Sequence, residues 1–462
     1  MAFGCAGSSP AFRTNIDDEK PRERGFFYFL TIPGKPAHCP GRQVAQCHNE
    51  PLDALTNNAQ TARWIELNIL TRQTVASPTE DDHFRPGIEA LQASRADEAQ
   101  AHFRAAVDAG LATTKSWLGL TLASLVRGDN RAAETAVDEV LTREPHNLRG
   151  LIIKGDLLLG RDEQREAVSH YNLVMRLAAT LADIPQQLQQ DLVRIQGRLE
   201  QISEAFQAQL LDGLHAGGYR RDASSARFNL GLDMLMGKAE REDDARPFPQ
   251  KPHAFYLPDM PYQPFYPNAE LPWVKEVEAA TDAIEAELTA FLESRAQAFA
   301  PYIHGGLELP GQTPDSLKDH DNWTAAFLTR DGVEDPDWSA SCPTVSALMG
   351  TLPLTAIKGF SPSVLFSKLK PGARIDPHTG LLNCRLICHL PLVVPADCGL
   401  RVGDERRDVV RGEAWAFDDS INHEAWNNSA DDRIVLIFDV WHPDLTEQER
   451  RDITSLLETV PD

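Results

Sequence analysis

The chain has 462 residues, of which 24% are charged, and a formal net charge of −23. This length accommodates two or three domains with hydrophobic cores of their own. The acidic balance argues against a nucleic-acid-binding protein, because phosphate binding requires a basic surface, and no apolar run approaches the ~20 residues of a membrane-spanning helix.

Residues 1–80 are rich in Pro, Asn, Arg and Cys and lack clear periodicity, which predicts a poorly ordered segment with one short helix near "TARWIELNIL". The apolar stretch "GFFYFLTIP" is short and has no clear cleavage site, so we expect no signal peptide and a cytoplasmic protein. The seven cysteines are scattered, which favours reduced thiols. Cys39 and Cys47, beside His38 and His48, fit no common zinc pattern, and chance proximity is the preferred interpretation.

A repeat of 34 residues marks the region 81–236, for which we predict a helical repeat domain. The period and its small-then-bulky spacing resemble tetratricopeptide repeats, whose paired helices approach at the small residue. One amphipathic helix cannot bury its face alone, so stacking into an α-solenoid is expected, with a long polar helix at about 184–212 as its cap. The residues in register are Ala99, Ala133 and Ala167; Phe103, Val137 and Tyr171; and Leu91, Leu125 and Leu159.

Residues 237–255 are rich in charge, proline and aromatic side chains and are interpreted as a linker. Apolar spacing then predicts a helix at about 272–297. From about residue 344 the chain changes to short β-branched and aromatic runs separated by turn residues, which predicts a β-sandwich or barrel. These runs are "SVLFSKL", "CRLICHLPLVV", "GLRVG", "EAWAFDD" and "IVLIFDVW". Residues 256–462 are therefore expected to form a jelly-roll domain, a cupin-like double-stranded β-helix.

Three segments of this strand-rich region carry candidate chemistry: "DPHTG" with His378, "NCRLICH" with His389, and "FDDSINHEAW" with His423. Imidazoles from distant strands can converge on one metal ion, although histidine ligands alone do not choose between iron, zinc, copper and nickel. Arg433, ten residues after His423, can form a fork with a carboxylate, which suits a dicarboxylic co-substrate. The alternative is that these histidines are ordinary surface or core residues, as we expect for His442 and His304.

The segments "PHTGLLNCRLICHLPLVVP", "FDDSINHEAWN" and "RIVLIFDVWHPDLT" resemble the aspartyl/asparaginyl β-hydroxylase family of iron(II)- and 2-oxoglutarate-dependent oxygenases, over about residues 256–455. The resemblance implies that two histidines hold iron(II) without the usual carboxylate, and the matching residues are His378 and His423. It also implies that Ser367, His389 and Arg433 bind 2-oxoglutarate.

The chain departs from the family pattern at a few positions. Gly380 stands where many iron oxygenases have an aspartate ligand, and the two-histidine pattern of the family accommodates it. Ile387 replaces an arginine of family members, and Arg385 on the same strand face is a candidate substitute. Asp419 is a candidate for orienting a water molecule or a histidine, or else an ordinary turn aspartate. Animal members carry a cysteine pair ahead of the motif, of which this chain has only Cys342.

The resemblance implies an enzyme that uses O2 and 2-oxoglutarate to hydroxylate the β-carbon of Asp or Asn in a peptide or protein, releasing succinate and CO2. The solenoid would hold the substrate chain. Two alternatives remain open at this point. One is a related oxygenase acting on a lipid or small molecule, and the other is a non-catalytic adaptor with a degenerate oxygenase domain.

Overall fold

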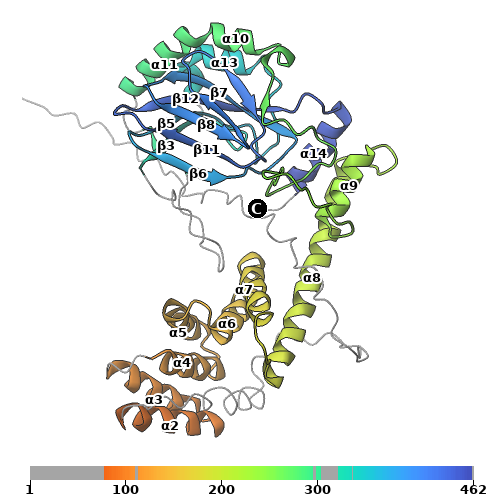
Figure 1. The fold of residues 1–462 in the computed structure, drawn as a ribbon. Helices are drawn as coiled ribbons and strands as arrows, with labels where there is room; N and C mark the ends of the chain where they lie inside the picture. The colour runs from red at the N-terminus through yellow and green to blue at the C-terminus, as the bar shows by residue number, and fades with distance from the viewer. Residues whose placement is uncertain (1–77, 110–112, 295–297, 303–320, 336, 460–462) are drawn as a thin grey trace, which may run out of the picture.

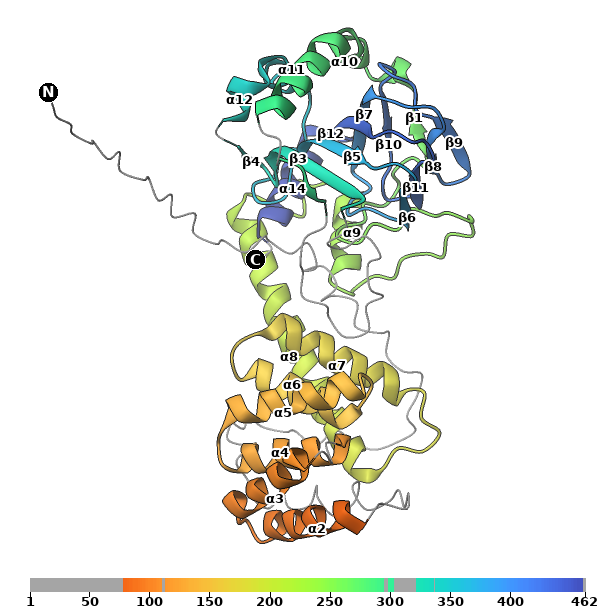
Figure 2. The same cartoon turned by 90° about the vertical axis from the view of Figure 1, so that its left-hand side faces the viewer.

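The computed structural model describes residues 78–109, 113–294, 298–302, 321–335 and 337–459 (Figure 1). The predicted helix near "TARWIELNIL", the Cys39/Cys47 pair with its histidines, and His304 lie outside these ranges. Within them, no helix is long and apolar enough to cross a membrane. The chain forms an N-terminal array of helices and a C-terminal domain of antiparallel sheets, and a long helix runs between the two (Figure 2).

The helices of the array follow one another as hairpins that stack along the molecule (Figure 2). Glycines make room for aromatic residues of an adjacent helix: Gly119 for Phe103 of the helix before it, and Gly155 for Tyr171 of the helix after it. A Cβ on Gly119 would lie 2.4 Å from the ring of Phe103, and one on Gly155 would lie 2.5 Å from the ring of Tyr171. The helices are α2 (Pro78–Gln92), α3 (Ala96–Asp108), α4 (Thr114–Val126), α5 (Asn130–Arg143), α6 (Leu148–Leu159) and α7 (Gln164–Ala178).

Two further helices connect the array to the C-terminal domain. The helix expected at 184–212 is α8 (Gln186–Ala216), which extends from the array to the sheets (Figure 1). Its end and α9 (Ala226–Leu235) pack against the C-terminal helix α14 (Glu447–Thr459) in one hydrophobic cluster. Arg227 of α9 adds a partly buried ion pair with Glu449, at 2.6 Å between Nε and Oε1.

Two antiparallel sheets make up the C-terminal domain. The eight-stranded sheet has the order β1-β10-β7-β12-β5-β3-β2, with β4 paired to β3. Its strands are β1 (Phe265–Tyr266), β2 (Ala300–Pro301), β3 (Trp323–Arg330), β4 (Val333–Glu334), β5 (Val364–Leu369), β7 (Arg385–Val393), β10 (Trp415–Phe417) and β12 (Arg433–Trp441). The four-stranded sheet has the order β6-β11-β8-β9, formed by β6 (Arg374–His378), β8 (Cys398–Val402), β9 (Glu405–Asp408) and β11 (His423–Asn427).

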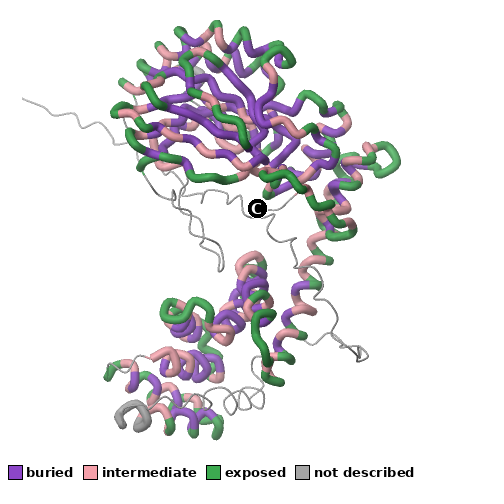
Figure 3. The backbone as a smooth tube through the Cα atoms, viewed as in Figure 1, coloured by how far each residue is buried: buried purple, intermediate pink, exposed green. Residues whose placement is uncertain are grey.

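Alternation along the strands of the large sheet sends successive side chains to two different cores. On β7, Leu386, Cys388 and Leu390 pack with the helices that cover the outer face of the sheet. Those helices are α10 (Val274–Ala279), α11 (Thr281–Ser294), α12 (Trp338–Ser341) and α13 (Pro343–Met349) (Figure 1). The opposite face meets the small sheet through Trp323, Trp415 and Phe417, among others. Figure 3 shows this interior as buried along most of its strands.

The helix expected at 272–297 is divided at Ala280 into α10 and α11. Thr281 begins the second helix, and its hydroxyl donates to the carbonyl of Glu278 at 2.6 Å. A side-chain hydroxyl that takes a backbone acceptor in this way competes with the regular helical ladder.

Part of the stretch interpreted as a linker hydrogen-bonds to the loop after β6. The amides of His253 and Ala254 donate to Gly380 and Leu381, at 3.0 and 2.9 Å, and Phe255 forms a parallel bridge with Leu382. The end of this stretch therefore contacts the loop that directly follows the first candidate histidine.

Candidate functional site

The two histidines predicted to bind metal face each other across the small sheet. His378 ends β6 and His423 begins β11, and the two residues are antiparallel register partners. Their ring centroids are 4.1 Å apart with the planes inclined by 52°. Strand pairing thus brings together two imidazoles that are 45 residues apart in sequence.

The backbone fixes the tautomer of both rings. Nδ1 of His378 lies 2.7 Å from the carbonyl oxygen of Asp376, and Nδ1 of His423 lies 3.0 Å from that of Ile421. A carbonyl oxygen only accepts, so in the neutral form of each ring Nδ1 carries the proton and Nε2 is the nitrogen that can bind a metal. Burial, followed by the proximity of His378, lowers the pKa of His423 to about 3, so that this ring is neutral at physiological pH.

Gly380 makes room for the carboxylate of Asp419. A Cβ at Gly380 would lie 1.9 Å from Oδ2 of Asp419, and the Gly380 amide donates to the Asp419 carbonyl at 2.6 Å. Asp419 thus occupies the space that any side chain at position 380 would take. Its Oδ1 is buried and has no hydrogen-bond partner among the described residues, so one acceptor remains available beside the histidine pair.

The predicted co-substrate residues lie on three neighbouring strands of the large sheet. Ser367 is on β5, His389 on β7 and Arg433 at the start of β12, and all three are buried. Ser367 Oγ accepts from Nε1 of Trp323 at 3.0 Å, which leaves its own hydroxyl proton to donate. Burial and then Arg433 and His423 hold the pKa of His389 well below its usual range, so His389 is a neutral imidazole close to both.

Arg433 is 2% exposed, and its Nε and Nη1 lack hydrogen-bond partners within the part of the chain that the structure describes. Burial lowers its pKa to about 10, which still leaves the guanidinium charged at neutral pH. Buried charged donors are almost always paired in proteins. An arginine in this condition fits a site for a carboxylate ligand.

Arg385 lies at the start of β7, and its guanidinium faces two carboxylates. Nη2 is 3.4 Å from Oδ2 of Asp419, and Nη1 is 3.6 Å from Oδ2 of Asp439. Two of its three nitrogens are therefore directed at acidic side chains of the protein. Ile387 lies two residues further along the strand, opposite Phe417 of β10.

Trp415 is a residue of this interior that the motifs did not single out. It is the register partner of His389, with the two ring centroids 6.2 Å apart. Its indole Nε1 is buried without a hydrogen-bond partner in the described ranges. The period-2 pattern of "EAWAFDD" was the available signal, because it places Trp415 on the same face as Phe417, whose ring contacts His389 and His423.

Side chains of the preceding segment complete the rim of the site. Nε2 of His253 lies 3.0 Å from the Thr379 hydroxyl, next to His378. Gln250 donates to Oδ2 of Asp418 at 2.7 Å, and burial raises the pKa of Asp418 to about 7. His442, by contrast, is buried with its ring edge-on to Tyr266 and accepts a hydrogen bond at Nδ1, as a satisfied core histidine does.

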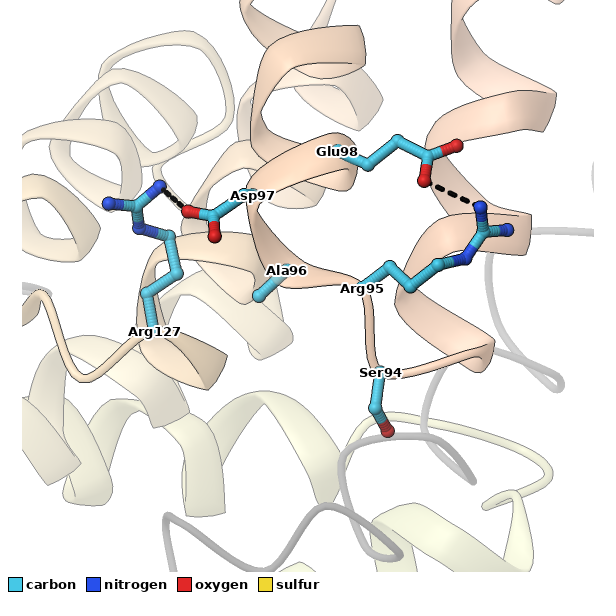
Figure 4. A pocket seen from close by; sticks show the side chains of 6 residues that line it. All are labelled: Ser94, Arg95, Ala96, Asp97, Glu98 and Arg127. Atoms are coloured by element: carbon cyan, nitrogen blue, oxygen red, sulfur yellow. Dashed lines mark hydrogen bonds and ion pairs between the residues drawn. The ribbon is translucent and has the colours of Figure 1, made fainter.

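No group of three or more His, Cys, Asp or Glu side chains is placed to hold a metal ion within the described residues. The arrangement offers two imidazoles and a carboxylate directed at an arginine. A hollow of about 620 Å³ lies far from them, between α3 and its neighbours, and is lined by Arg95, Asp97, Glu98 and Arg127 (Figure 4). These side chains pair with one another on the surface, so the hollow contains none of the candidate chemistry.

Comparison with known proteins finds similarity over the region that contains these residues. Residues 278–443 match the family model described as aspartyl/asparaginyl beta-hydroxylase. The chain is 32% identical over 215 residues to aspartate beta-hydroxylase domain-containing protein 2 of Xenopus tropicalis, covering 46% of this chain and 56% of that protein. It is 34% identical over 154 residues to aspartyl/asparaginyl beta-hydroxylase of Homo sapiens, covering 33% of this chain and 20% of that protein.

The matched region thus spans about half of the first relative and a fifth of the second. Among solved structures, a prolyl-4-hydroxylase of Pseudomonas putida aligns with 37% of this chain and 99% of its own length, at 15% identity. The TM-score of that alignment is 0.23, which is too low to carry a structural argument.

Proposed function

We propose that the chain, whose residues 278–443 match the aspartyl/asparaginyl β-hydroxylase family model, is an iron(II)- and 2-oxoglutarate-dependent dioxygenase. Its reaction is hydroxylation of the β-carbon of Asp or Asn in a peptide or protein. The two facing sheets then form a double-stranded β-helix around the site, and the helical array is a tetratricopeptide-like solenoid that holds the substrate chain.

The observation that carries the proposal is the histidine pair. His378 and His423 present Nε2 atoms with free lone pairs from rings 4.1 Å apart, while backbone carbonyls hold both Nδ1 protons. These two residues would hold iron(II). The metal, with 2-oxoglutarate and O2, supplies the oxidising chemistry that yields succinate, CO2 and one oxygen atom for the substrate carbon.

The buried residues of the large sheet support binding of the co-substrate. Arg433 and Ser367 hold the distant carboxylate of 2-oxoglutarate through charged N–H and hydroxyl donors. His389 is neutral, so it donates one hydrogen bond to the other end of the co-substrate without repelling the metal. Because all three are buried, the bound co-substrate is shielded from water and these hydrogen bonds are strong.

Asp419 would act without ligating iron(II). Its carboxylate is fixed beside Gly380, and the acceptor Oδ1 has no partner in the described part of the chain. It accepts a hydrogen bond from a water molecule at the histidine pair and orients it. The protein would then place a carboxyl group near the metal without using it as a third ligand.

The test is succinate formation from 2-oxoglutarate by the purified full chain with iron(II) and a candidate peptide, followed by mass spectrometry for the addition of one oxygen atom. His423→Ala should abolish turnover and weaken iron(II) binding while far-UV circular dichroism stays unchanged. His442→Asn removes a buried histidine away from the site and should retain both activities.

Undiminished turnover by His423→Ala would remove this histidine from the metal site. Oxygen addition to lipids or small molecules, and not to peptides, would retain the chemistry but replace the substrate class. A wild-type chain that binds neither iron(II) nor 2-oxoglutarate would support the adaptor alternative.

A further inference from the structure

We propose that Arg385 is a positioning residue, which joins Asp439 to Asp419 and thereby fixes the Asp419 carboxylate beside the histidine pair. This inference rests on the proposed function, because it describes how the chain shapes the same metal site. It assigns Arg385 a role other than contact with the co-substrate.

The anchor of this arrangement is Asp439 on β12, which is 2% exposed. Its Oδ1 accepts from the amide of Ser363 at 2.8 Å, and its Oδ2 accepts from the hydroxyl of Ser361. Both serines belong to the segment that leads into β5. The Asp439 carboxylate is therefore held in place from a neighbouring strand without help from Arg385.

Arg385 connects this anchor to the site. Its side chain is 5% exposed, and the two terminal nitrogens approach different carboxylates, Asp439 at 3.6 Å and Asp419 at 3.4 Å. A planar guanidinium with separated donors can span two acids in this way, whereas an ammonium group presents a single point charge. Because Asp439 holds one terminal nitrogen of Arg385, the position of the other nitrogen is set as well. That nitrogen in turn sets where the Asp419 carboxylate lies.

The Asp419 carboxylate is the group that Arg385 positions. Its Oδ2 is 3.4 Å from Arg385 and would lie 1.9 Å from a Cβ at Gly380, whereas its Oδ1 has no partner in the residues that the structure describes. One oxygen therefore faces the arginine and the other remains free to act toward the histidine pair. Loss of Arg385 would leave a buried carboxylate without its cation, and such a carboxylate moves or becomes protonated.

Cobalt(II) alone, added to metal-free protein, is the probe, because its visible absorption reports the ligands and geometry of the bound ion. Arg385→Gln should change this spectrum and weaken cobalt(II) binding by up to about 10-fold, the lower end of the range for groups that contact metal ligands, because Arg385 acts through Asp419, which is not itself a ligand. Arg385→Lys keeps the charge but loses the fork, so we expect a smaller change. Asp419→Asn should reproduce the effect of Arg385→Gln.

The double variant decides whether Arg385 acts through Asp419. If it does, Arg385→Gln combined with Asp419→Asn binds cobalt(II) no more weakly than either single variant. Arg227→Gln is the matched control, since it breaks the partly buried ion pair with Glu449, away from the site. It should lower stability and leave the cobalt(II) spectrum and affinity unchanged.

Additive losses in the double variant, or an unchanged spectrum and affinity in Arg385→Gln, would overturn this inference while the histidine pair stands. A wild-type chain that binds no cobalt(II) would overturn both this inference and the proposed function. If Arg385→Gln does not fold, Arg385→Lys and Asp419→Asn give the same decision.

Discussion

The helical array and the sheet interior each contain an arginine beside buried groups, but the Arg194 side chain of the array is 38% exposed and Arg433 of the sheet interior is 2% exposed. In the array, Arg194 of α8 donates to both oxygens of Asp156, at 2.6 and 3.0 Å, and the Tyr171 hydroxyl donates to the same carboxylate at 2.6 Å. In the sheet interior, Arg433 is more deeply buried, and the described residues provide no acceptor for its Nε and Nη1.

The difference separates a structural ion pair from a binding site. A buried donor left without a partner costs ~1–3 kcal/mol of stability, and a charged donor costs more. The network around Asp156 avoids that cost within the protein, whereas for Arg433 the proposed function assigns this role to the carboxylate of the co-substrate. Exchanging each arginine for an apolar residue of similar length should therefore have opposite consequences in the two regions.

The largest effect is expected for Arg433→Met. The variant loses the cation for the co-substrate, and kcat/KM for 2-oxoglutarate should fall about 100-fold, equal to about 3 kcal/mol at about 1.4 kcal/mol per factor of ten. Its unfolding free energy should not fall, because an unpaired buried charge is replaced by an apolar side chain. Steady-state kinetics and urea unfolding of the same preparation measure both quantities.

A marked loss of stability in Arg433→Met, together with an unchanged requirement for 2-oxoglutarate, would place this arginine with the structural ion pairs.

The second prediction concerns the loss of stability in acid that is caused by the buried histidine His442. Burial, and then the charge of Arg227, lowers its folded pKa to about 4, from about 6.5 in the unfolded chain. Between these values the unfolded chain binds the additional proton. The stability that neutral His442 contributes is therefore complete above pH 6.5 and is lost as pH falls toward 4. The loss at pH 4 is on the order of 3 kcal/mol, at about 1.4 kcal/mol per pKa unit.

The measurement compares wild type with His442→Asn, whose amide oxygen can accept the same hydrogen bond from the Asp444 amide without titrating. Urea unfolding from pH 7 to 4 should show a smaller loss for the variant. Asp418, whose folded pKa is raised by burial, acts in the opposite direction but is present in both proteins, so it cancels. Parallel curves would mean that His442 does not cause the acid sensitivity.

The counterpart of the first prediction is Arg194→Met. Asp156 would keep the Tyr171 hydroxyl but lose its cation, and we expect about 2 kcal/mol less stability, below the ~3–5 kcal/mol of a fully buried pair because Arg194 is partly exposed. Turnover of free 2-oxoglutarate should be unchanged. If Arg194→Met lost turnover but kept full stability, Arg194 would have the role that is proposed for Arg433, and the contrast between the two regions would be wrong.

The same contrast explains what the sequence could predict. The 34-residue spacing of the helical region identifies helices whose contacts are with their neighbours in the chain, as Phe103 and Tyr171 illustrate. The strands β5, β7 and β12 were visible as β-branched or aromatic runs. In contrast β6, "RIDPH", is mostly exposed and contains a proline, so no local pattern marks it as a strand.

The candidate site residues could be named from the sequence, but their contacts could not. His378, His423 and Arg433 stand out through the family resemblance. The position of Asp419 beside Gly380, and the attachment of Arg385 to Asp439, depend on strand register and on the loop before β5. Such long-range pairings leave no periodic signal in one sequence.

The smallest effect is expected at Trp415, which the family motifs did not single out. Its indole N–H lies in the same interior as Arg433, beside His389, and has no acceptor within the described chain. If this donor also serves the ligand, Trp415→Phe removes one neutral hydrogen bond, worth ~0.5–1.5 kcal/mol, and raises KM for 2-oxoglutarate about fivefold with little change in kcat. Trp338→Phe is the matched control, because its equally buried indole N–H also has no partner in the described residues but packs under the outer helices. An equal KM in both variants would mean that an unpartnered buried donor does not by itself mark a binding site in this chain. The assignment of Arg433 to the co-substrate site would then depend on its charge alone.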